Sequence, residues 1–142
     1  MKKFIRSAVL LLLSVLLATS LIACGNTVKK EGLWENATYR KDMEFGEGAK
    51  TAVVEVKVED ETVTFTIHTD KDTVGDALIE HELISGEEGA YGLYIKTVNG
   101  ITADYDTDQS YWAFYIDGEY AMTGVDGTEI DADARYTLEY AK

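Results

Sequence analysis

Hydrophobic and polar residues alternate strictly in two adjacent stretches of this chain. Residues 54–58 alternate valine with charged side chains, and residues 62–68 alternate Thr or His with Val, Phe or Ile. Period-two alternation of this kind, rich in β-branched residues, predicts half-buried β-strands. Only Glu59-Asp60-Glu61 separates the two stretches, so we expect an antiparallel hairpin.

A helical pattern follows the hairpin. Thr73 is suited to cap a helix N-terminus, and Asp76 stands three residues later, where its carboxylate favours the positive helix end. The apolar positions then recur at helical spacing, at Val74, Ala77, Leu78, Leu83 and Ile84. Gly86 is expected to end the helix. The pattern predicts one amphipathic helix of roughly 12 residues.

Further strands are predicted after the helix. They cover residues 91–98, 111–116, 119–122 and 135–140, with turn signals at Asn99-Gly100 and Asp117-Gly118. The order of hairpin, helix and strands predicts an α+β fold. It resembles a β-grasp (ubiquitin-like) fold, in which a mixed sheet packs on one helix and the first and last strands run parallel.

The N-terminus has the pattern of an export signal. Lys2, Lys3 and Arg6 precede an apolar run from residue 8 to residue 18, which is short for a membrane span of about 20 residues. Leu21-Ile22-Ala23-Cys24 resembles a bacterial lipobox. The resemblance implies that residues 1–23 are removed and that Cys24 is lipidated, so we expect a protein anchored in the cell membrane on its extracytoplasmic side.

Residues 24–50 are expected to form a lipidated tether, because they show scattered glycines and charges without sustained periodicity. Trp34 is the exception, and we expect it either to dock on the domain or to rest at the lipid interface. Residues 51–142 are the expected folded domain.

Composition narrows the possible functions. Cys24 is the only cysteine, which excludes an internal disulfide and a cysteine-based zinc site. After residue 24 there are 10 basic and 26 acidic residues. This balance argues against nucleic acid as a partner, since phosphate binding needs clustered Lys and Arg.

Catalytic motifs are sparse. The histidines are His68 and His81, and the serines beyond Cys24 are Ser85 and Ser110. None of them forms a recognisable nucleophile, base and acid arrangement, and no second histidine completes a zinc helix motif. The sequence therefore favours a binding protein over an enzyme.

One acidic loop has the opening of a calcium site. Asp104, Asp106 and Asp108 stand at alternate positions, and Ca²⁺ prefers several such oxygen ligands. Gln109 and Tyr115 occupy the places of the glycine and the glutamate of an EF-hand, so the loop is not an EF-hand. The alternatives are a weaker calcium site and a solvated acidic turn.

Aromatic residues are densest in residues 111–116. If Trp112, Phe114 and Ile116 face the helix, strand alternation turns Tyr111 and Tyr115 to the other face. Exposed amphipathic rings suit ligand or partner recognition. The alternative is that a second layer or the tether covers them.

Several segments together resemble a known group. Residues 73–78, 91–95, 98–101, 111–118 and 124–125 resemble a family of small bacterial secreted domains of unassigned function. That family is similar to the C-terminal β-domain of transcobalamin and intrinsic factor, the animal cobalamin carriers. The resemblance covers residues 51–140.

The resemblance implies a module that contributes one wall of a corrinoid (cobalamin) site. Carried over by position, the ligand-binding residues are Tyr111, Trp112, Tyr115, Met122, Gly124 and Val125. The α-barrel domain that supplies the other wall in the animal carriers has no counterpart here, so we expect weak binding or a partner.

Three functions follow from these patterns. The first is a lipid-anchored extracellular module that captures a corrinoid or similar planar ligand for a membrane transporter, without any required cofactor. The second is a cell-surface module that binds a protein or glycan. The third is a calcium-binding domain.

Overall fold

The computed structural model describes residues 27–142. The predictions made for residues 1–26, including the lipobox and Cys24, lie outside the described residues. Within the described part of the chain, no helix has the length and apolar character needed to cross a membrane.

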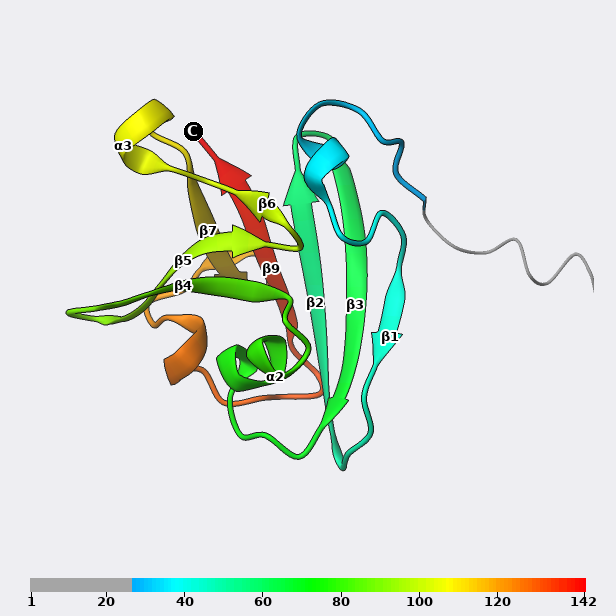
Figure 1. Cartoon of the computed structure of the whole chain (residues 1–142). Helices are drawn as coiled ribbons and strands as arrows, with labels where there is room; N and C mark the ends of the chain where they lie inside the picture. The colour runs from blue at the N-terminus through cyan, green and yellow to red at the C-terminus, as the bar shows by residue number, and fades with distance from the viewer. Residues whose placement is uncertain (1–26) are drawn as a thin grey trace, which may run out of the picture.

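A six-stranded mixed sheet forms the larger layer (Figure 1). Its strands, in spatial order, are β1 (Met43–Phe45), β3 (Glu61–Thr69), β2 (Lys50–Val58), β9 (Arg135–Ala141), β7 (Tyr111–Ile116) and β8 (Glu119–Tyr120). The predicted hairpin is confirmed as the antiparallel pair β2–β3. The parallel pairing of β2 with β9, with Val54 opposite Tyr136, confirms the expected β-grasp arrangement.

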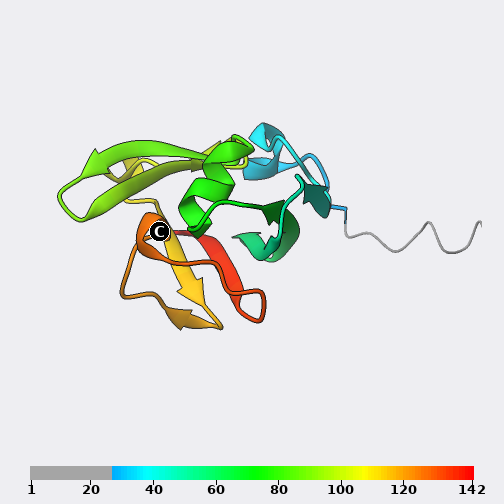
Figure 2. The same cartoon turned by 90° about the horizontal axis from the view of Figure 1, so that it is seen from below.

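A second, three-stranded sheet was not predicted. It consists of β4 (Ile84–Gly89), β5 (Gly92–Val98) and β6 (Ile101–Thr102), all antiparallel. The helix α2 (Val74–Glu80) lies between the β4–β5 hairpin and the last strands of the larger sheet (Figure 2). The α+β class is confirmed.

The core follows the alternation along β2 and β3. Every second residue of both strands is fully buried, as in Val56 and Phe65. The same layer continues across the sheet with Tyr136 and Leu138 of β9. Because alternate residues point to opposite faces, the threonines and charged residues between them lie on the solvent side.

The helix is shorter than predicted. Thr73 is its N-cap and accepts a hydrogen bond from the backbone N–H of Asp76, as expected. The helix ends at Glu80, because Glu82 adopts the left-handed conformation with φ 56° and Leu83 donates to the carbonyl of Leu78. This is a Schellman ending without glycine. The prediction that Gly86 ends the helix was wrong, since Gly86 lies in β4.

The prediction of a tether was wrong for residues 27–50. Trp34, in the 3-10 helix η2 (Gly32–Asn36), is only 3% exposed, and its indole N–H donates to the carbonyl of Val58 at 3.4 Å. Val28 is equally buried, and β1 adds a parallel edge strand to β3. Apolar burial and strand pairing make this segment part of the domain, and the docking of Trp34 is confirmed.

Candidate functional site

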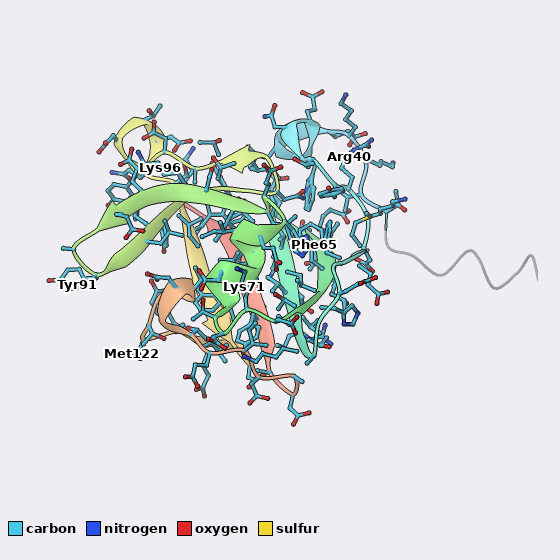
Figure 3. All side chains as sticks on the ribbon, turned by 60° about the horizontal axis from the view of Figure 1, so that its bottom comes forward. Arg40, Phe65, Lys71, Tyr91, Lys96 and Met122 are labelled. Atoms are coloured by element: carbon cyan, nitrogen blue, oxygen red, sulfur yellow. The ribbon has the colours of Figure 1, made fainter. Side chains whose placement is uncertain are left out.

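A groove of about 660 Å³ opens at the β7–β8 end of the larger sheet. It lies between β5, β7 and the segment from β8 to the 3-10 helix η3 (Val125–Gly127). The lining residues are Tyr91, Leu93, Tyr94, Ile95, Tyr111, Trp112, Phe114 and residues 120–127. In Figure 3, Tyr91 and Met122 project from the same side of the molecule.

Exposed apolar side chains gather at this groove. The structure of residues 27–142 has seven large hydrophobic side chains that are exposed, and five of them line the groove. They are Tyr91, Tyr94, Tyr111, Tyr120 and Met122. Tyr91 and Met122 are almost fully exposed, at 101% and 96%. Apolar surface concentrated in this way, rather than scattered, marks an interaction site.

The groove brings together most of the residues predicted for ligand binding. Tyr111, Trp112, Met122, Gly124 and Val125 all line it. Strand β7 supplies the first two, and the segment after β8 supplies the rest.

Tyr115 does not line the groove. Its ring stands edge-on to Tyr120 with 5.6 Å between the ring centroids, so it packs on the β7–β8 hairpin. Its neighbour Phe114 lines the groove instead, on the same face of β7 as Trp112. The assignment of Tyr115 to the ligand wall is therefore corrected.

Sequence reasoning missed the contribution of the β4–β5 hairpin. Tyr91, Leu93, Tyr94 and Ile95 form one side of the groove. The run from residue 91 to residue 95 was visible as part of the family resemblance. Its position opposite β7 depends on the second sheet, which local periodicity did not reveal.

The floor of the groove is formed by buried, closely packed side chains. Trp112, Phe114 and Val125 are at least nine-tenths buried. Trp112 stands edge-on to Tyr140, and Phe114 stacks on Tyr136 with ring centroids 6.1 Å apart. Trp112 Nε1 is buried and lacks a hydrogen-bond partner among the described residues. Aromatic pairs of this kind hold a preformed surface for a ligand.

Asp126 attaches the segment of residues 121–127 to β5. Its carboxylate oxygen Oδ2 accepts a hydrogen bond from the backbone N–H of Leu93 at 3.1 Å. On the other side, the backbone of η3 packs closely on α2, because a Cβ added at Gly75 would stand 2.9 Å from the Cα of Asp126. These contacts position one wall of the groove relative to the other.

Gly124 leaves the space that the Asp126 carboxylate needs. Its φ of −71° is accessible to any residue, so the turn itself does not require glycine. A Cβ at Gly124 would stand 2.9 Å from Oδ1 of Asp126. The absence of a side chain therefore makes room for the Asp126 carboxylate.

The carboxylates of the acidic loop accept hydrogen bonds from backbone N–H and hydroxyl groups of the same loop. Asp104 caps the short helix α3 (Tyr105–Asp108) by accepting hydrogen bonds from the N–H of Asp106 and the hydroxyl of Thr107. Asp108 accepts hydrogen bonds from the hydroxyl and N–H of Ser110, which lower the pKa of the Asp108 carboxyl below its ordinary value. Within residues 27–142, no three His, Cys, Asp or Glu side chains are placed to hold a metal ion together.

The histidines lie away from the groove. His68 pairs with Glu44 and contacts the hydroxyl of Thr51 at 3.2 Å, and His81 packs beside Phe45. The described residues that line the groove include no His, Ser or Cys.

A model of one protein family matches residues 71–142 of this chain, and the description of that family is "Domain of unknown function (DUF4430)". The match begins before α2 and includes every residue that lines the groove. No curated protein matches the chain.

The chain is similar to several solved structures, of which two are the following. The first is described as a candidate metal binding protein from Ruminococcus gnavus, with 33% sequence identity and a TM-score of 0.62. The alignment covers 66% of this chain and 98% of that protein. The second is haptocorrin in complex with Cbi, with 20% identity and a TM-score of 0.48, covering 69% of this chain and 26% of that protein.

Proposed function

The chain belongs to the DUF4430 family, and we propose that it is a ligand-binding module whose site is the groove between β5, β7 and η3. The observation that carries the proposal is the gathering of five exposed tyrosine and methionine side chains around one groove. The tyrosine rings present flat, amphipathic surfaces at little cost in conformational entropy.

The ligand that this groove suits is flat and largely apolar. The volume of about 660 Å³ lies within the range of roughly 300–1,000 Å³ that is typical of small-molecule sites. The groove has a buried aromatic floor and tyrosine rings along its rim, which favour stacking. A corrinoid or a similar planar molecule is the ligand class that we propose, in keeping with the resemblance of the sequence to the cobalamin carriers.

The proposal includes a lipid anchor at Cys24 on the extracytoplasmic side of the cell membrane. The described chain starts beside β1, where Val28 donates a backbone hydrogen bond to Arg40. β1 and β8 are the two opposite edges of the six-stranded sheet, and in Figure 3 Arg40 lies on the side opposite Tyr91 and Met122. An anchor at this end would leave the groove open for capture of a ligand and its delivery to a membrane transporter.

Cobalamin titration tests the proposal. We would titrate the full chain in lipid nanodiscs with cyanocobalamin and follow binding by calorimetry and by the corrin absorbance, with empty nanodiscs as the blank. Saturable binding is expected. Tyr111→Ala and Met122→Ala should each weaken it by about fivefold or more, because each removes a contact with the ligand.

Tyr105→Ala is the matched control for these variants, because Tyr105 is an exposed tyrosine of α3 outside the groove. It should bind as the wild type does. Equal affinity in all four proteins would show that cobalamin binds elsewhere. Absence of binding at high micromolar concentration would remove the corrinoid.

A cell-surface module that binds a protein or glycan is the second candidate. It is favoured by the near-complete exposure of Tyr91 and Met122 at the rim, since fully exposed anchors suit a large partner. A stoichiometric surface partner recovered with the wild type, and lost with Tyr91→Ala, would support this function.

A calcium-binding domain is the third candidate, supported by the description of the Ruminococcus gnavus relative. It predicts that Ca²⁺ raises the melting temperature and that changing Asp104, Asp106 and Asp108 to Asn abolishes the rise. An unchanged melting temperature would exclude this candidate.

A further inference from the structure

The charge on the described side chains that line the groove is of one sign. Of the described residues that line it, Asp126 is the one acid, and none is Lys, Arg or His. Asp126 is exposed, and its hydrogen bond from the uncharged backbone N–H of Leu93 does not neutralise it. A ligand in the groove therefore meets a negative charge without a compensating positive one.

The charges around the groove also make its electrostatic potential negative. Lys96 follows the groove-lining part of β5, and its ammonium is paired with Glu87 at 3.2 Å. Beyond residue 26 the chain has 10 basic and 26 acidic residues. A net charge of this sign repels anions and raises the local concentration of cations near the surface.

The aromatic rings of the groove also favour a positively charged ligand. Four tyrosines and Trp112 line the groove. The face of an aromatic ring carries negative partial charge and attracts an ammonium or another organic cation placed above it. The walls thus favour positive charge by a mechanism that is independent of Asp126.

We propose that the groove selects a flat apolar ligand that carries a positive charge, such as a protonated amine or a quaternary ammonium group, over a ligand of net negative charge such as a carboxylate. This inference rests on the proposed function, because it specifies the charge of the ligand that the groove binds. A cation satisfies both the Asp126 carboxylate and the ring faces, whereas an anion opposes both.

Three probes with one ring system test the inference on the full chain in nanodiscs. They are 1-naphthylmethylamine, which is protonated at neutral pH, 1-naphthalenemethanol, which is neutral, and 1-naphthoate, which is an anion. The amine should bind about three- to tenfold more tightly than the alcohol, and the carboxylate at least about tenfold more weakly than the amine. The preference should shrink as salt is raised.

Asp126→Asn separates the sources of the preference. Asn retains the acceptor for the Leu93 N–H, so the loop should keep its position and the protein its melting temperature. The advantage of the amine over the alcohol should fall about threefold while some remains from the rings. Asp60→Asn, in the distant β2–β3 turn, removes the same charge and should leave the ratio unchanged.

The outcomes distinguish two failures. Binding of the alcohol and the carboxylate as tightly as the amine, with Met122→Ala weakening all three, would overturn the charge preference and leave the groove as a binding site. Lack of saturable binding by the three probes while cyanocobalamin still binds would overturn this inference alone, and lack of binding by the probes and by cyanocobalamin would overturn the proposed function as well.

Discussion

The side chain of Asn99 pairs with the backbone of Tyr39, which is 60 residues earlier in the chain. Its amide Nδ2 donates to the carbonyl of Tyr39 at 2.7 Å, and its Oδ1 accepts from the N–H of Tyr39 at 2.9 Å. Asn99 is 1% exposed and adopts a left-handed φ of 51° in the β5–β6 turn. One residue thus forms the turn and holds the N-terminal segment on the domain.

The first prediction concerns this pair. Asn99→Gly keeps the left-handed turn but removes both side-chain hydrogen bonds, and should lower the free energy of unfolding by about 2–3 kcal/mol. Chemical denaturation measures the loss, and proteolysis should cut residues 29–41 sooner. Glu59→Gly, in the left-handed β2–β3 hairpin turn, is the control and should change stability little.

Trp34 provides a second test of the same segment. Because it is buried and covers the end of β2, Trp34→Ala should cost about 3–5 kcal/mol of unfolding free energy. Leu33→Ala, at a half-buried neighbour, should cost clearly less in the same denaturation experiment. Wild-type stability of Trp34→Ala would mean that residues 27–50 are a tether after all.

Gly75 tests the connection between α2 and the groove. Its added methyl group in Gly75→Ala would press on the backbone of Asp126, so we expect a loss of about 1–3 kcal/mol and weaker ligand binding. Gly127→Ala is the matched control, since its Cβ would meet nothing nearer than 3.9 Å. Equal melting temperatures for the two variants would contradict the close packing of η3 on α2.

The lowered pKa of Asp108 predicts how the stability of the protein depends on pH. The hydrogen bonds from Ser110 hold the pKa of the Asp108 carboxyl in the folded protein below its ordinary value of 3.8. The resulting stability is present above pH 3.8 and is lost as the pH falls through the lower folded pKa. Asp108→Asn should therefore destabilise the protein at about pH 6, and the difference from the wild type should shrink near pH 2.5. A difference that grows with acid would contradict this sign.

The parts of the fold that were predictable carry local signals. The β2–β3 hairpin follows from alternation over residues 54–68, and the cap at Thr73 from its side chain and spacing. Tyr111, Trp112 and Met122, which the family resemblance assigned to the ligand wall, line one groove. The expected family and the α+β class are confirmed.

The errors arose where stability depends on distant contacts. Residues 27–50 show no periodicity, because single contacts such as Trp34 with Val58 and Tyr39 with Asn99 hold them. Strand β4 is exposed over residues 85–89 and contains two glycines, so it lacks an apolar alternation. Tyr115 was misplaced because the second sheet, which determines the open side of β7, was not foreseen.

The two described methionines allow the most direct test of the groove. Met122 lines it, whereas Met43 lies in β1 at the opposite edge of the sheet. With the methionine methyl groups labelled with ¹³C, NMR would follow both signals of the full chain in nanodiscs as cyanocobalamin or 1-naphthylmethylamine is added. We predict a saturable shift of the Met122 methyl signal and a stationary Met43 signal. A stationary Met122 signal, or equal shifts of both, would contradict ligand binding in the groove.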